Sequence, residues 1–454
     1  MPYNEQLLKH VDAYGYPLPP GRRWKLRRRA IDTGKNAVAG MIAALLSVIG
    51  VLLRLGRLGR RYPPLTPRSF HPRRILVIRL DPIGDLVLSL TVVHTLKRAY
   101  PEATIDLLAT PTSAKVITID PHLAGVILYD PNLWRRPGAL IKSKNWRDLR
   151  RLLAALHARH YDLAISLYGS WAATLAVLSG AKRRVGYGAE SFPGFMTDSV
   201  PGRHWEAGDH LHEVDYCLKL AQAAGATVTP ADRVPHLTVD PRAQAEVAQM
   251  LAEEGIQSGK LLIACHVCSS NGQSKRWPIP YWTALLDRLI REQGAQIVLT
   301  GAPNDLPLIE RVTNHMQEHA VNLAQKTSLA QLAALLQRAN LLITGDSGPM
   351  HIASAVGTPL IAVHGPTDPA QSGPVSLNAT ILHSDIWCSP CYNARTPADC
   401  RFFTTQCMKN IRPQQVYEAV LSKLQLSDTA AAAKKLASTN EIVNITSTNQ
   451  DNYA

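Results

Sequence analysis

The feature that most constrains the fold is an alternation of short apolar runs with segments of helical spacing, which occurs twice in the chain. Residues 75–78 are all apolar, as in a strand buried on both faces of a parallel sheet, and a helical segment follows over 86–100. The alternation continues to about residue 167 and restarts near residue 260. Such alternation with short joins is typical of α/β domains. We therefore expect two doubly wound, Rossmann-like domains that face each other across a cleft.

The expected elements divide the chain into four parts. An N-terminal domain over 73–240 and a C-terminal domain over 241–425 follow an arm and linker over 1–72, and a polar tail over 426–454 is expected to be disordered. The expected strands cover 74–80, 104–109, 126–129, 163–167, 260–265, 295–300, 341–344 and 360–363. The expected helices include 86–100, 146–160, 280–293, 329–338, 350–356 and 413–424.

The positive charge is concentrated before the first domain. Residues 1–74 hold 15 Lys and Arg residues against three acids, a net +12 of the chain's +14. Within this arm the segment 37–53 carries no charge, and at 17 residues it is borderline for spanning a bilayer, which takes about 20. We expect residues 22–61 to associate with an anionic membrane surface, either lying on it or spanning it. The alternative is a helix that packs on the protein body or on a second subunit.

The charge and the cysteines also bear on partners and compartment. A nucleic-acid partner is not expected, because it would need a basic face on a folded domain with interleaved aromatic residues. The N-terminus lacks the pattern of a cleavable signal peptide, and seven cysteines are an odd number. Both features indicate a reducing compartment. We therefore expect the protein in the cytoplasm, at the inner face of the membrane.

The loop over 81–85 follows the first expected strand, and ligands of doubly wound sheets bind at the carboxyl ends of the strands. Gly84 would let the backbone approach a ligand closely. Asp85 would lie at a helix start, where the helix dipole favours its ionised form. Such a carboxylate can act as a general base on an acceptor hydroxyl. The alternative is that Asp85 only caps the helix.

A second loop, over 266–278, follows the first strand of the C-terminal half. Lys275 or Arg276 would neutralise a diphosphate, and Ser269 and neighbouring serines would form hydrogen bonds with it. The alternative is a solvated surface loop in which Trp277 packs against the core.

A third loop, over 344–351, follows a strand and opens a helix. Ser347, Gly348 and the first helical N–H groups form an anion site at a helix N-terminus. Asp346 can accept hydrogen bonds from sugar hydroxyls, and His351 lies one turn into the helix. The pattern also fits an ordinary capped helix start.

At these residues the chain resembles glycosyltransferase family 9, the bacterial heptosyltransferase family of lipopolysaccharide core synthesis. No single motif is specific, but all of them occur in the family's order over about residues 73–425. The matching stretches are 75–80 with 83–85, then 275–278, 344–351, 357–359, 365–369 and 388–391 with Cys400 and Cys407.

The resemblance implies a GT-B fold, an ADP-heptose donor and inverting transfer without a metal or other cofactor. Asp85 resembles the family's proposed general base, and Lys275 resembles the lysine that binds the donor phosphates. Asp346 resembles the acidic residue beside the donor sugar, with Ser347, Gly348 and His351 in the phosphate-binding loop. The acceptor would be a lipopolysaccharide core or a similar lipid-linked glycan.

The sequence departs from the family pattern in three places. Where the family often has His-Pro-Gly, this chain has the stretch 266–268, and the turn before Asp85 carries an additional carboxylate, Asp81. The arm over 1–72 is not part of the usual family core. These departures bear on the sugar and the acceptor rather than on the chemistry.

Four late cysteines leave a structural metal site open. Their spacing of two, eight and six intervening residues is compatible with tetrahedral zinc, although the second pair is too widely spaced for a standard zinc ribbon. The alternative is that they are reduced thiols. The four are Cys388, Cys391, Cys400 and Cys407.

Two other functions remain open from the sequence. A nucleotide-sugar epimerase of the same two-domain fold would isomerise the donor without an acceptor. A non-catalytic, membrane-tethered module would bind a nucleotide or glycan without turnover. The presence of Asp85 and Lys275 on loops that face each other favours sugar transfer over both the epimerase and the binding module.

Overall fold

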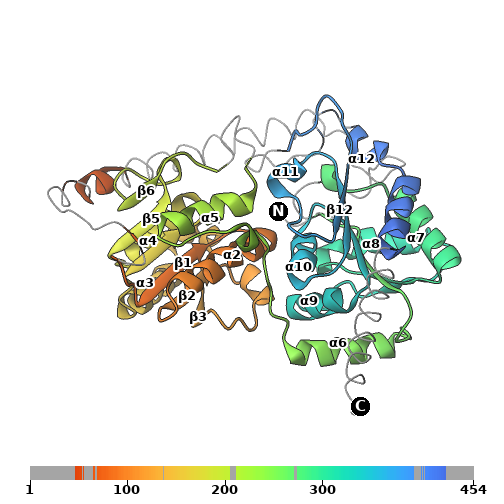
Figure 1. The fold of residues 1–454 in the computed structure, drawn as a ribbon, viewed down its shortest axis with the longest axis horizontal. Helices are drawn as coiled ribbons and strands as arrows, with labels where there is room; N and C mark the ends of the chain where they lie inside the picture. The colour runs from red at the N-terminus through yellow and green to blue at the C-terminus, as the bar shows by residue number, and fades with distance from the viewer. Residues whose placement is uncertain are drawn as a thin grey trace, which may run out of the picture.

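A computed structural model describes most of the chain. The described residues are 47–53, 55, 65–66, 69–135, 138–204, 211–269, 273–392, 400, 402 and 404–425. The expected disordered tail and most of the basic arm lie outside these residues. Two parallel sheets of six strands each, with helices on both faces, form the two halves of the molecule (Figure 1).

The N-terminal sheet has the strand order β3-β2-β1-β4-β5-β6, and every pair in it is parallel. Strand order therefore reverses between β1 and β4, which is the topological switch point of a Rossmann fold. The strands are β1 (Arg74–Arg79), β2 (Thr104–Ala109), β3 (Gly125–Leu128), β4 (Leu163–Ser166), β5 (Arg183–Tyr187) and β6 (Asp198–Val200).

The C-terminal sheet repeats this topology. Its order is β12-β11-β10-β7-β8-β9, so its switch point lies between β10 and β7. The strands are β7 (Leu262–His266), β8 (Gln296–Leu299), β9 (Val321–Asn322), β10 (Leu341–Gly345), β11 (Leu360–His364) and β12 (Ala379–His383). The predicted pair of doubly wound sheets is confirmed.

The helices cover the sheets as parallel crossovers require. In the N-terminal half they are α2 (Ile83–Ala99), α3 (Ser143–Ala158), α4 (Gly169–Leu178) and α5 (Glu213–Ala223). In the C-terminal half they are α6 (Pro241–Glu253), α7 (Ile279–Gln293), α8 (Leu306–Thr313), α9 (Leu329–Arg338), α10 (Gly348–Val356), α11 (Pro369–Ser372) and α12 (Gln406–Asn410), followed by a helix over 413–425. Short 3-10 turns include η2 (Ser113–Val116), η6 (Pro230–Arg233) and η7 (Gln273–Lys275).

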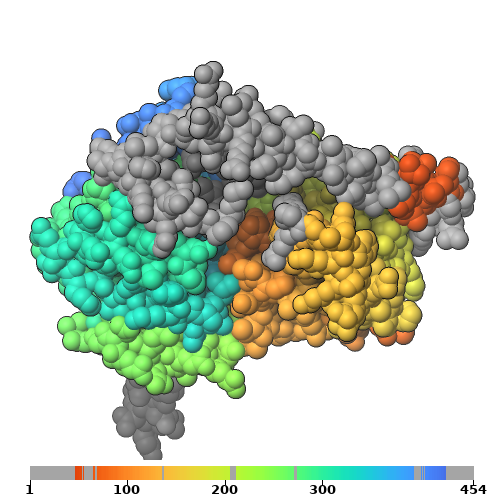
Figure 2. Space-filling model, turned by 180° about the vertical axis from the view of Figure 1, so that it is seen from behind, coloured from red at the N-terminus to blue at the C-terminus, as the bar shows by residue number. Residues whose placement is uncertain are grey.

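The two halves share one apolar core where they meet. A single buried cluster includes Leu86 and Leu90 of α2 together with Leu335 of α9 and Ile352 of α10. Helix α2 packs directly against α10 (Figure 1). From behind, the two halves form separate masses that meet along this seam (Figure 2). Since apolar burial is the main favourable term in association, the seam holds the two sheets in a defined relation.

Part of the uncharged segment 37–53 lies among the described residues. Residues 47–53 are helical, and a side chain at Gly50 would collide with the carbonyl of Pro193. Leu53 packs on an apolar cluster that contains Phe195. This portion therefore packs on the protein body, as the alternative interpretation holds. Among the described residues no helix has the length and apolar character that crossing a bilayer requires.

Candidate functional site

The candidate loops lie at the switch points of the two sheets. Residues 80–82 connect β1 to α2, and residues 346–347 connect β10 to α10. The N-terminal ends of these two helices meet. A Cβ added to Gly348, the first residue of α10, would lie 3.5 Å from the Cβ of Ile83, the first residue of α2. The structure thus brings Gly84, Asp85, Gly348 and the loop before α10 to one place.

Gly84 is needed for this close approach. A Cβ at this position would lie 2.6 Å from Cδ2 of His351, closer than such atoms approach each other. The absence of a side chain at Gly84 leaves room for the imidazole of His351 from the opposite half, and the expected close approach of the Gly84 backbone to a ligand stays a prediction. A larger residue there would require the His351 ring to move.

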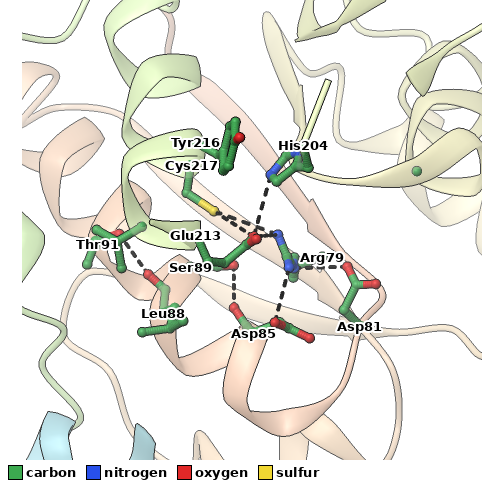
Figure 3. A network of polar contacts seen from close by, with 12 residues as sticks. Arg79, Asp81, Asp85, Leu88, Ser89, Thr91, His204, Glu213, Tyr216 and Cys217 are labelled. Carbon is green, nitrogen blue, oxygen red and sulfur yellow. Dashed lines mark hydrogen bonds and ion pairs between the residues drawn. The ribbon is translucent and has the colours of Figure 1, made fainter. Parts of the chain in front are cut away.

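Asp85 lies in the first turn of α2 and faces Arg79 at the end of β1 (Figure 3). The buried guanidinium of Arg79 reaches three carboxylates. Its Nε lies 2.9 Å from Oδ2 of Asp81, its Nη2 lies 3.6 Å from Oδ1 of Asp85, and its Nη1 lies 2.9 Å from Oε1 of Glu213 on α5. One cation therefore orients both carboxylates of the loop.

A second cation supports this network. His204 Nδ1 lies 2.8 Å from Oε1 of Glu190, and its Nε2 lies 3.5 Å from Oε1 of Glu213. Burial alone would lower the pKa of His204, but Glu213 and the hydrogen bonds around the ring raise it to about 12. At neutral pH the ring is therefore charged. The cluster contains two cations, Arg79 and His204, and four carboxylates, which are Asp81, Asp85, Glu190 and Glu213. Because negative charge is in excess, protonation of one of the carboxylates is favoured.

The pKa of Asp85 is raised in this cluster, and so is that of Asp81. Burial raises the pKa of the Asp85 carboxyl, the negative charges of Glu213, Asp81 and Asp346 raise it further, and Arg79 opposes them; the net pKa is about 7. About a third of the side chain, 31%, remains accessible to solvent. An accessible carboxyl that ionises near neutral pH is suited to accept a proton from a bound hydroxyl.

The opposite half contributes a buried ion pair. Lys275 Nζ donates to Oδ2 of Asp346 at 2.7 Å, and it also lies 3.9 Å from the ring centroid of Tyr392. Burial raises the pKa of Asp346, but the positive charge of Lys275 outweighs it and lowers the value to about 2. The alternative of a solvated loop is wrong for this part of 266–278, because Ser274 and Lys275 are buried.

Two buried histidines adjoin this pair. Burial lowers the pKa of His351 to about 4 against the opposing charge of Asp346, and it also lowers the pKa of His364. Both rings are therefore neutral at pH 7. Nδ1 of His351 and Nε2 of His364 have no hydrogen-bond partner among the described residues. Buried polar atoms without partners are rare, so each of these nitrogens has a hydrogen-bonding position that a water or a ligand can fill.

The start of α10 leaves its helical N–H groups available. Ser347 is the N-cap, but its hydroxyl pairs with Thr344 Oγ1 at 2.9 Å and does not cap the helix. Free N–H groups at a helix N-terminus are a common position for anions in proteins. Ser269 is buried nearby in the β7 loop, where its carbonyl accepts from Nη2 of Arg276. The ligand contacts expected of Ser347, Gly348 and Ser269 stay predictions.

Several residues of the site were not identified from the sequence: Arg79, Glu213, His204, Tyr392 and His364. Arg79 carried a usable signal, since a charged residue inside a buried strand requires a partner. Its partner Glu213 comes from a helix 134 positions later and gave no such signal.

The late cysteines do not assemble into a metal site among the described residues. Three-ligand groups occur there at His94, Asp120 and His122 and at His204, Glu213 and Cys217, but not at the late cysteines. None of the seven cysteines, all of which lie among the described residues, forms a disulfide. Burial, together with the nearby Cys391, Cys400 and Cys388, raises the pKa of the Cys407 thiol to about 12. The four late cysteines are therefore close enough to influence one another electrostatically, but they do not form a group with the spacing of metal ligands.

Comparison with known proteins identifies the class of enzyme. Residues 149–401 match the profile of glycosyltransferase family 9 (heptosyltransferase). A lipooligosaccharide heptosyltransferase 2 of Haemophilus influenzae is 30% identical over 318 residues, covering 68% of this chain and 88% of the relative. A lipopolysaccharide heptosyltransferase 2 of Escherichia coli K12 is 28% identical over 365 residues, covering 79% of this chain and 100% of the relative.

The fold agrees with this assignment. The solved structure of E. coli ADP-heptose lps heptosyltransferase II superposes with a TM-score of 0.62 at 23% identity, over 78% of this chain and 99% of that one. The protein is therefore a GT-B glycosyltransferase. More particularly, the chain belongs to glycosyltransferase family 9, the heptosyltransferases. This membership supports sugar transfer rather than the epimerase alternative.

Proposed function

We propose that this enzyme transfers heptose from ADP-heptose to a lipopolysaccharide core or similar lipid-linked glycan, with inversion and without a metal. The names of the relatives supply the donor and acceptor class. The observation that carries the proposal is the meeting of α2 and α10, where Asp85 faces the Lys275–Asp346 pair and the neutral His351.

Asp85 acts as the general base in this proposal. Its carboxylate removes the proton of the acceptor hydroxyl as the oxygen attacks the anomeric carbon of the donor sugar. The bond from that carbon to the diphosphate breaks, and ADP leaves with the electron pair. Attack from the face opposite the leaving group inverts the anomeric configuration.

The C-terminal half stabilises the charge that develops on the leaving diphosphate. The N–H groups at the start of α10 and the ammonium of Lys275 are the available positive ends. Lys275 is held by Asp346, so it is oriented before the donor arrives. Asp346 is then placed to accept hydrogen bonds from the sugar hydroxyls.

Lys275→Ala tests the donor side. We expect the Kd for ADP-heptose to rise roughly tenfold to a hundredfold, the range of a lost charge-assisted hydrogen bond. Isothermal titration calorimetry measures this change. Lys326→Ala is the matched control, because Lys326 is an exposed cation of the same half whose ammonium pairs with Glu254. Equal donor affinity in the Lys275 variant and the wild type would contradict the assignment.

A panel of nucleotide sugars tests the donor identity. We expect ADP-heptose to bind more tightly than other ADP-sugars and than UDP- or GDP-sugars. Incubation with the preferred donor alone should leave its sugar unchanged by NMR. An isomerised donor would indicate an epimerase, and tight binding without transfer to any acceptor would indicate a non-catalytic module.

We also propose that the arm over 22–61 lies on the anionic cytoplasmic surface of the inner membrane. The described helix supports this proposal, because Val48, Val51, Leu52 and Leu55 share one helical face and are 58%, 47%, 62% and 54% exposed. Gly50 and Leu53 face the protein body. An apolar helical face beside a basic segment is suited to lie in the headgroup layer.

Flotation with vesicles tests the membrane proposal. The wild type should float with vesicles of phosphatidylglycerol and phosphatidylethanolamine but not with pure phosphatidylcholine. Replacing Val48, Val51 and Leu52 together with Ser should weaken binding roughly tenfold or more, because three apolar side chains leave the lipid. Leu377→Ser is the control, since Leu377 is 99% exposed in the other half. Unchanged flotation of the triple variant would rule out this helical face as the contact.

A further inference from the structure

We propose that His94, Asp120 and His122 bind a divalent transition metal ion of the zinc type. The three residues lie on the N-terminal half, away from Asp85. His94 is on α2, and Asp120 and His122 lie in the segment before β3. This site is independent of the proposed function and of the late cysteines.

The ligand atoms already have the spacing that a metal requires. His94 Nε2 lies 3.2 Å from Oδ2 of Asp120, and His122 Nδ1 lies 3.2 Å from Oδ1 of the same carboxylate. One ligand atom from each residue lies within 4.8 Å of the others. Zinc bonds of about 2.0–2.1 Å in a tetrahedron place ligand atoms about 3.3 Å apart. A metal therefore fits between these groups with small side-chain movements.

The chemistry of the set also fits. Two imidazoles and one carboxylate are ligands that zinc, cobalt and nickel accept, whereas calcium and magnesium prefer oxygen alone. The carboxylate is fixed in place: its side chain is 1% exposed, and Oδ1 also accepts the backbone N–H of His122 at 2.8 Å. The imidazoles are 21% and 41% exposed, so an ion can reach them.

The surroundings provide room for a further ligand. His94 and His122 line a pocket of about 360 Å³ together with Thr91, Arg98, His236 and Thr238. His236 and Thr238 belong to the segment that connects the two halves. A bound ion with three protein ligands keeps an open coordination position for water or for a side chain of this segment.

Without a metal, the two imidazole–carboxylate contacts are hydrogen bonds, and a direct measurement of metal binding distinguishes the two states. The site lies nine residues along α2 from Asp85, about 13 Å at 1.5 Å per residue. A bound ion should therefore tie α2 to the segment 120–122 without entering the transfer reaction. The expected effect is on stability rather than on turnover.

The test uses full-length protein stripped of metal by chelation and then titrated with Zn²⁺ and Co²⁺. The wild type should bind Zn²⁺ and gain thermal stability. The His94→Gln/His122→Gln variant should lose one equivalent of binding, or bind at least tenfold more weakly, while its transfer activity stays unchanged. His315→Gln is the matched control, because His315 is an isolated exposed histidine whose Nδ1 pairs with the Arg311 carbonyl.

Cobalt separates this site from the thiols. A Cys388→Ser/Cys391→Ser variant removes two of the four late cysteines and should retain the site at His94. Its Co²⁺ complex should show d–d absorption without thiolate-to-metal charge transfer. Identical Zn²⁺ stoichiometry and affinity in the wild type and the double histidine variant would overturn the proposal. Loss of all Co²⁺ absorption in the double cysteine variant would do the same.

Discussion

Asp85→Asn should reduce the rate of heptosyl transfer roughly 100- to 10,000-fold, the usual contribution of a general base, while donor affinity changes little. Asparagine keeps the size of the side chain but accepts no proton at neutral pH. Transfer is measured as ADP release with acceptor in excess, and donor affinity by calorimetry. Turnover within about threefold of wild type would remove Asp85 from the role of base.

Asp81→Asn is the matched control for this variant. Asp81 contacts the same guanidinium and lies in the same loop, but its side chain is less accessible, at 19%. Its loss should change the pH dependence more than the maximal rate. If Asp81→Asn were inactive and Asp85→Asn active, the base would be Asp81.

The pH dependence follows from the same carboxyl. Because the base works ionised and its pKa lies at about 7, kcat/KM should rise about tenfold per pH unit below 7 and level off above it.

The raised pKa of Asp85 also means that the folded state binds the proton more tightly than the unfolded state. Stability should therefore fall as the pH rises from about 4 to 7. Asp85→Asn should avoid this loss and match or exceed the wild-type Tm at pH 8.

Arg79→Met should both destabilise the fold and shift the pH profile. Removing one partner from a buried ion pair typically costs about 3–5 kcal/mol, and Arg79 is 2% exposed while facing three carboxylates. Arg79 lowers the pKa of Asp85, so its loss should raise that pKa further. The acidic limb of the kcat/KM profile should move up by about one to three pH units.

A purely structural role for Arg79 would lower Tm without moving the limb, so the profile distinguishes the two roles. Arg79→Lys keeps the charge but loses the fork that reaches three carboxylates. The Arg79→Lys variant should return the acidic limb of the kcat/KM profile most of the way to its wild-type position, while recovering only part of the lost Tm. An unchanged limb in a folded Arg79→Met variant would contradict the positioning role.

Much of the fold follows from local pattern. The strands over 104–109 and 341–345 and the helix over 329–338 were predicted within a residue, because apolar runs and helical spacing are local signals. Helix α4 was missed, since it is apolar on all sides and has no periodic polar face. Strand β12 was missed because it is only partly buried at the sheet edge.

The candidate site depends partly on long-range contacts that local sequence pattern does not predict. The loops around Asp85, Lys275 and Asp346 could be identified because ligands bind after strands, and the structure brings these loops together. The partners that set the pKa values at the site could not be identified, because Glu213 pairs with Arg79, and His204 with Glu213, only in the folded chain. The contact of Gly84 with His351 likewise depends on how the two halves pack. The four-part division of the chain stays a prediction.

The central claim is heptosyl transfer through Asp85, and one experiment tests it most directly. Purified full-length protein is incubated with ADP-heptose and a truncated lipopolysaccharide acceptor, in parallel with Asp85→Asn, and the glycolipid is analysed by mass spectrometry. We expect the wild type to add one heptosyl residue with release of ADP, and the variant to add almost none. Addition of a different sugar, isomerised donor without transfer, or equal product from both proteins would contradict the claim.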